Sequence, residues 1–178
     1  YTIAPYLLPA LVRLLHKRAP RMPLLLQENY THRLSEMLRQ GEIDAAILAL
    51  PFEEPGFAVE VLYDEDFLVA VPRDHAWVAR KSIRSLELKK ESMVLLGTGH
   101  CFRDQVLQVC PELNRQMAGE GLQRTFEGSS LETIRQMVAS GVGVTVLPAS
   151  SVPPKVPRDS LLAYVPFAPP VPERRIAL

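Results

Sequence analysis

One stretch, FEGSSLETIRQMVASGVGVTVLP at residues 126–148, constrains the fold more than any other part of the chain. Ser129 and Glu132 have the spacing of a capping box that opens a helix, and Gly141 has the position of a residue that ends one. The apolar residues between them recur at helical spacing and then give way to a β-branched run, VTVLP. The inward stripe is formed by Leu131, Ile134, Met137 and Val138. The stretch therefore predicts a helix followed directly by a buried strand.

The same alternation occurs near the start of the chain. TIAPYLLPALVRLLHKRAP predicts a helix that begins near Pro5 and ends before Pro20, and PLLLQEN predicts a short buried strand. Thr31 can N-cap the next helix, which Gly41 ends, and IDAAILAL then has the length of a buried strand. Alternating helices and strands indicate an α/β fold with a mostly parallel sheet.

Further elements follow along the chain, so that one alternating set lies before about residue 66 and a second set lies after it. Strands are expected at 58–63 and 67–71 on either side of the acidic turn DED, at SMVLLG, at LLAYVPF and at the terminal RRIAL, with a helix from Cys101 to Cys110. Two alternating sets predict two lobes joined by extended segments near residues 64–70 and 166–175. A small ligand is then expected in the cleft between the lobes.

Composition excludes several classes of protein. The 178 residues carry 20 basic and 20 acidic side chains, so a nucleic-acid-binding surface is not expected on this chain itself. With no charged leader and no apolar run of about 18 residues, a cytoplasmic protein is the default expectation. Two cysteines are too few for a disulfide scaffold, and their spacing does not suit a metal site, so neither metal nor cofactor is expected. The pair Gly97 and Gly99 is too short for a dinucleotide fingerprint.

Cys101 stands at a position that favours a reactive thiol. It follows the turn GTGH and opens a predicted helix, where unpaired backbone N–H groups and the helix dipole favour the thiolate. His100 and Arg103 could add positive charge. Peroxides oxidise thiolates to sulfenic acid, and Cys110 is the other thiol with which that acid could condense. The alternative is that either cysteine is simply a small buried apolar residue.

The spacing of the two cysteines limits how they could bond. Nine residues of α-helix advance about 13.5 Å, whereas a disulfide requires Cα atoms within about 7 Å. A bond between Cys101 and Cys110 is therefore incompatible with the intact helix. Its formation would have to unwind and refold the segment, which would make the pair a conformational switch.

Four stretches together carry a family resemblance: GHCFRDQVLQVC, SLETIRQMVASGVGVTVLPA, PYLLPAL and GEIDAAILAL. The chain resembles the regulatory domains of the peroxide sensors among the LysR-type transcriptional regulators. This implies an α/β, two-lobed, periplasmic-binding-protein-like fold with Rossmann-like lobes. Lobe I would hold residues 1–66 plus 176–178, and lobe II, with both cysteines, residues 67–175. The family's N-terminal winged helix-turn-helix domain is absent from this sequence.

The resemblance also implies roles for individual residues. Cys101 matches the peroxidatic cysteine, which peroxide attacks first, and Cys110 the resolving cysteine. Five further residues match the family's reactant pocket and the surroundings of its thiol: Thr2, Thr31, His100, Asp104 and Arg175. Plainer structural roles stay open, because Thr31 could be only an N-cap, Asp104 could only balance a helix dipole and Arg175 could be only a surface charge. The segment PELNRQMAGEGLQ after Cys110 departs from the family pattern.

The function implied is that of a bacterial cytoplasmic peroxide sensor rather than an enzyme. Hydrogen peroxide would oxidise Cys101, and the refolding of about residues 100–110 would alter dimer or tetramer geometry and DNA binding. The partners implied are promoter DNA, bound through the N-terminal domain, RNA polymerase, and glutaredoxin or thioredoxin as the reductant. The alternatives are a thiol peroxidase, and a LysR-type effector domain that binds a small organic anion.

Overall fold

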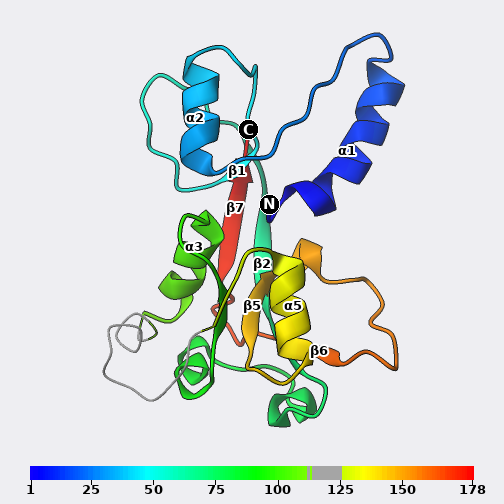
Figure 1. The fold of residues 1–178 in the computed structure, drawn as a ribbon, viewed down its shortest axis with the longest axis vertical. Coiled ribbons are helices and arrows are strands. Elements are labelled where there is room, and N and C mark those ends of the chain that lie inside the picture. Colours follow the sequence, from blue (N-terminus) through cyan, green and yellow to red (C-terminus); the bar gives the residue numbers. More distant parts are fainter. Residues whose placement is uncertain (112, 114–125) are drawn as a thin grey trace.

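The computed structural model of the chain describes residues 1–111, 113 and 126–178. The described α-helices are α1 (Ala4–Arg18), α2 (Thr31–Arg39), α3 (Cys101–Val109) and α5 (Leu131–Ala139). The strands are β1 (Leu48–Ala49), β2 (Val61–Pro72), β3 (Val94–Leu96), β4 (Phe126–Gly128), β5 (Thr145–Pro148), β6 (Leu162–Pro166) and β7 (Glu173–Ala177). In Figure 1, α1 and α2 lie at one end of the molecule, α3 and α5 lie at the other, and β2 and β7 connect the two ends.

The strand β2 runs through both parts of the protein. From Val61 to Asp66 it pairs with β7, and from Phe67 to Pro72 it pairs with β5 and β6, antiparallel in each case. The expectation of two strands separated by a turn at DED is therefore wrong. The acidic residues alternate along one continuous strand: Asp64 and Asp66 are exposed, whereas Glu65 is buried opposite Arg174.

The expected mostly parallel sheet is also wrong. The five-stranded sheet formed by β1, β7, β2, β5 and β6 is antiparallel throughout. Among the described residues, parallel pairing occurs between β3 and β4 and at two isolated bridges. The long strand β2 is the reason, because its first half pairs with β7 and its second half with β5 and β6, and each of these strands runs opposite to it. A rule based on alternating helices and strands does not detect long connecting strands of this kind.

The end with α3 and α5 contains the main core. Expected strands at SMVLLG, VTVLP and LLAYVPF are confirmed as β3, β5 and β6, and RRIAL lies largely within β7. The core includes Phe67, Phe102 and Ile134, each at most 2% exposed. The rings of Phe67 and Phe102 meet edge to face with centroids 5.2 Å apart. This packing fixes one face of α3 on the crossover strand β2.

The end with α1 and α2 is more open. The helix expected between Pro5 and Pro20 is confirmed as α1, but none of its residues is buried. The buried strand expected at PLLLQEN is wrong, because residues 23–30 form no strand and Leu25 is 82% exposed. Of IDAAILAL, only Leu48 and Ala49 form a strand. The apolar side chains of α1 and residues 22–26 instead line a large cavity.

Two helix starts lie one residue away from their expected positions. Tyr30, not Thr31, is the N-cap of α2, and no side chain caps that helix. Ser130, not Ser129, caps α5, with its hydroxyl accepting from the Thr133 N–H at 3.1 Å. Both helices end in the expected glycine turn, since Gly41 and Gly141 have φ values of 71° and 81°.

The proposed division into residues 1–66 plus 176–178 and residues 67–175 stays a prediction. The segment after Cys110 lies mostly outside the described residues. Within the described part of the chain, no helix has both the length and the apolar character that a membrane crossing requires.

Candidate functional site

Cys101 is the first residue of α3 and follows a tight turn from β3. The turn depends on Gly99, whose φ of +97° is strained for residues with a side chain, and the Tyr30 ring lies against this glycine. Helix α3 then begins with His100 as its N-cap. Because the first backbone N–H groups of a helix lack partners within it, Cys101 lies at the end of α3 where backbone donors are available.

Cys110 lies at the other end of the same helix and is only 1% exposed. The helix expected between the cysteines is confirmed over Cys101–Val109, and no disulfide joins Cys101 to Cys110. The nine intervening steps correspond to about 13.5 Å along the helix axis, roughly twice the Cα separation that a disulfide allows. The structure therefore shows the dithiol state, with the two sulfurs held apart by an intact helix.

A cavity of about 1220 Å³ reaches Cys101. Four of the predicted site residues line it together: Thr2, Thr31, His100 and Cys101. The rest of the described lining is mostly apolar, with leucine its commonest residue, and it also includes the acidic residues Glu28, Glu42 and Asp44. We call the part of the cavity lined by Thr2, Thr31, His100 and Cys101 the candidate reactant pocket.

His100 contributes an aromatic surface rather than a charge. It is 7% exposed, and its ring meets those of Tyr30 and Tyr1 edge to face, at centroid distances of 5.1 Å and 5.5 Å. Burial lowers the pKa of His100 below the ordinary value of 6.5. The imidazole is thus neutral at pH 7 and supplies no positive charge to the thiolate, contrary to the expectation from sequence. Tyr30 itself was not among the residues that the sequence suggested.

Arg103, the other expected source of positive charge, is engaged by neighbouring groups of the protein. Its guanidinium donates to the Leu96 carbonyl at 2.7 Å and forms an ion pair with Glu127 at 2.9 Å. These contacts fix the first turn of α3 to the ends of β3 and β4. Arg103 therefore anchors the helix, and its charge is balanced by a carboxylate.

Asp104 and Arg175 do not reach the pocket. Asp104 is exposed on α3, and Arg175 is exposed on β7, where its guanidinium makes two hydrogen bonds to Asp64 at 2.7 Å and 3.1 Å. The neighbouring arginine, Arg174, is the one that points inward. It binds both the hydroxyl and the carbonyl oxygen of Thr2, and its guanidinium carbon lies 5.2 Å from the centroid of the Phe102 ring.

Among the described residues, no group of three His, Cys, Asp or Glu side chains could hold a metal ion. The predicted residues that line the cavity offer one thiol, two hydroxyls and a neutral imidazole.

A two-lobed α/β domain with this pocket matches one family along its full length. Residues 1–178 match the LysR substrate binding domain, and the chain belongs to this family.

Within the family, the chain is similar to OxyR. It is 41% identical to the DNA-binding transcriptional dual regulator OxyR of Escherichia coli K12 over 177 residues, which are 99% of this chain and 56% of that protein. It is 40% identical to the hydrogen peroxide-inducible genes activator of Pectobacterium carotovorum, covering 99% of this chain and 57% of that protein. The chain thus spans little more than half the length of these curated relatives.

A solved structure supports the same relationship. The reduced form of the OxyR regulatory domain from Pseudomonas aeruginosa superimposes with a TM-score of 0.86 at 50% identity. The match covers 99% of this chain and 83% of that one. The likeness to a reduced form agrees with the unbonded cysteine pair and the intact α3.

Proposed function

We propose that this chain is the regulatory domain of a peroxide-sensing transcription regulator, in which Cys101 reacts with hydrogen peroxide and Cys110 then forms a disulfide with it. One observation carries the proposal. Cys101 opens α3 and lines the same cavity as Thr2 and Thr31, whereas Cys110 is buried at the far end of the same intact helix. A disulfide between them requires α3 to unwind, so oxidation must change the conformation.

The roles of the surrounding residues follow from their positions. Thr2 and Thr31 carry hydroxyls that can hydrogen-bond a peroxide, and neutral His100 closes the pocket against solvent. We assign the positive charge near the thiol to Arg174 in place of Arg175, because Arg174 is buried beside Thr2 and Phe102. For Asp104 we propose no contact with the reactant. Its role is that of an acidic residue in the first turn of α3.

The partners belong to the whole protein and are proposals as well. By analogy with the relatives, the protein binds promoter DNA through a separate domain, works as a dimer or tetramer in the bacterial cytoplasm and acts on RNA polymerase. A glutaredoxin or thioredoxin would reduce the disulfide and reset the sensor. Because each molecule reacts once per reset, we do not propose an enzyme.

The test is a titration of the reduced protein with hydrogen peroxide, followed by mass spectrometry of its peptides and by limited proteolysis. We expect one Cys101–Cys110 disulfide per chain, complete near one equivalent of peroxide, with new cleavage sites in residues 101–110. The variant Cys101→Ser should show neither change, and Cys110→Ser should stop at the sulfenic acid. A Cys101→Ser protein that still changed its cleavage pattern would refute the proposal.

The thiol peroxidase alternative is tested in the same samples. With thioredoxin, thioredoxin reductase and NADPH present, an enzyme would consume many equivalents of peroxide at a constant rate. We expect NADPH consumption limited to about one equivalent per chain for each addition of peroxide. Sustained turnover would favour the enzyme.

A further inference from the structure

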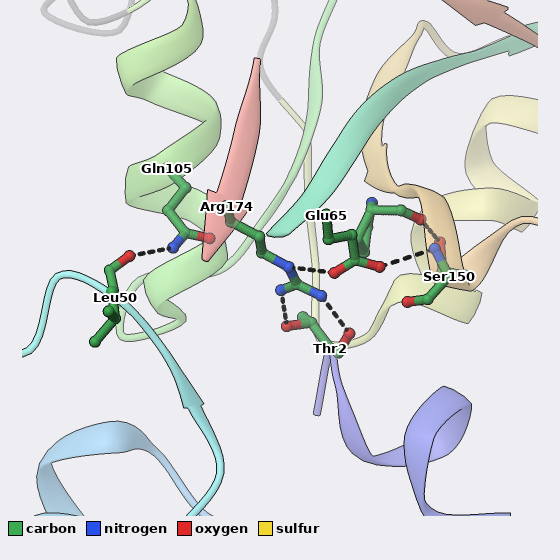
Figure 2. Close-up of polar contacts among 8 residues, drawn as sticks. Thr2, Leu50, Glu65, Gln105, Ser150 and Arg174 are labelled. Carbon is green, nitrogen blue, oxygen red and sulfur yellow. Dashed lines mark hydrogen bonds and ion pairs between the residues drawn. The ribbon is translucent and has the colours of Figure 1, made fainter. Parts of the chain in front are cut away.

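Glu65 and Arg174 form a buried ion pair next to the candidate reactant pocket. Their side chains are 4% and 1% exposed, and Arg174 Nε lies 2.7 Å from Glu65 Oε2. The second carboxylate oxygen, Oε1, accepts from the Ser150 N–H at 2.8 Å. Figure 2 shows Arg174 between Glu65 on one side and Thr2 on the other. A buried carboxylate held at both oxygens has little freedom, so it fixes the guanidinium that it binds.

The remaining donors of Arg174 determine what Thr2 can do. Nη1 donates to Thr2 Oγ1 and Nη2 donates to the Thr2 carbonyl oxygen, both at 2.9 Å. A hydroxyl that accepts from a guanidinium keeps its own proton to donate elsewhere. Among the described residues, Thr2 Oγ1 has no other hydrogen-bond partner, and Thr2 lines the cavity that contains Cys101.

We infer that Glu65 is a positioning residue for the peroxide reaction. It holds Arg174 on the acceptor side of the Thr2 hydroxyl, so that the hydroxyl proton is directed into the candidate reactant pocket. This inference rests on the proposed function. It assigns to Glu65, on the crossover strand β2, an effect on a thiol that it does not touch.

The chemical step defines when that proton matters. The Cys101 thiolate attacks one peroxide oxygen, the S–O bond forms as the O–O bond breaks, and the sulfur is oxidised to sulfenic acid while the other oxygen leaves as hydroxide. The hydroxide takes a proton from solvent and becomes water. A donor aimed at the leaving oxygen stabilises the negative charge that develops on it, and removal of one such donor slows comparable reactions by about 100-fold.

A purely structural role for the pair makes a different prediction. The pair joins β2 to β7 and, through Ser150, to η4 (Ala149–Ser151). If Glu65 only maintained the fold, its loss would alter access to Cys101 for every reagent alike. If it positions a donor, only a reaction that needs the donor would slow.

The experiment therefore measures two rates for Cys101 in the reduced protein. One is sulfenic acid formation with hydrogen peroxide, and the other is alkylation by iodoacetamide, whose iodide leaving group needs no hydroxyl donor. We expect Glu65→Gln to lower the peroxide rate at least about tenfold while leaving the alkylation rate within about twofold. Thr2→Val should show the same split, and Thr2→Ser should restore the peroxide rate.

The matched control is Asp64→Asn, which breaks the exposed ion pair with Arg175 between the same two strands. We expect it to change neither rate. Equal loss of both rates in Glu65→Gln, or an unchanged peroxide rate in Thr2→Val, would overturn the inference even if one variant folded poorly. A parent protein whose Cys101 reacts no faster with peroxide than free cysteine would instead refute the proposed function, so the two failures are distinguishable.

Discussion

If disulfide formation requires α3 to unwind, the rate of that step should depend on the intrinsic stability of the helix. Gln108 offers a clean perturbation because it is exposed on α3 and makes no hydrogen bond or ion pair with any described residue. Glycine is less favourable than alanine in a helix interior by about 1 kcal/mol, and by about half of that near a helix end. At 0.59 kcal/mol for RT, the unwound population should differ by about two- to fivefold between Gln108→Gly and Gln108→Ala.

The assay follows the lifetime of the Cys101 sulfenic acid after a single addition of peroxide. Samples are quenched with dimedone at increasing times, and mass spectrometry gives the fractions of trapped sulfenic acid and of disulfide. We expect Gln108→Gly to form the disulfide two- to fivefold faster than Gln108→Ala, with equal rates of sulfenic acid formation. Equal disulfide rates, or a faster alanine variant, would refute the claim that helix unwinding limits this step.

Two further predictions concern stability. Burial keeps His100 neutral with a lowered pKa, so as pH falls below 6.5 the unfolded chain takes up a proton that the folded chain resists, and the free energy of unfolding decreases. Urea denaturation between pH 7.5 and 5 should show a smaller decrease for His100→Gln, and an identical pH profile would contradict this account. A Cβ at Gly143 would lie 2.2 Å from the Ser92 carbonyl oxygen, so Gly143→Ala should cost about 3 kcal/mol by the same method. The control is Gly41→Ala, where the added Cβ would meet no atom within 4 Å and only the positive φ opposes the substitution. It should lower the free energy of unfolding by about 1 kcal/mol. Equal losses in the two variants would refute the steric explanation for Gly143.

The fold could be predicted from the sequence where local signals suffice. The helix stripes and glycine ends of α2 and α5 depend on neighbours within a few residues, so both elements were found, with their caps misplaced by one position. The direction of the strands could not be found in this way. It depends on β2 pairing with β7, whose partners Glu65 and Arg174 are 109 residues apart in the chain.

The arginine at the site could have been found with a stricter use of strand alternation. Side chains two apart in a strand share a face, so Arg174 lies on the same face as buried Ile176, and Arg175 lies on the other. The same rule places Glu65 with buried Phe67 and Val69. The family resemblance indicated Arg175, whereas the period of the strand shows that its neighbour Arg174 is the one buried beside Thr2.

The first half of α3 carries contacts to both ends of the molecule. Gln105 donates to the Leu50 carbonyl at 3.2 Å (Figure 2). The Arg174 guanidinium, from strand β7, lies over the Phe102 ring. His100, just before the helix, meets the Tyr30 ring at the start of α2. Cys110, by contrast, is buried in the main core at the other end of the helix. To bring the sulfurs together, residues 101–109 must lose the helical geometry on which the Phe102 and Gln105 contacts depend. The thiol chemistry is thereby linked to the contacts that hold the two ends of the protein together.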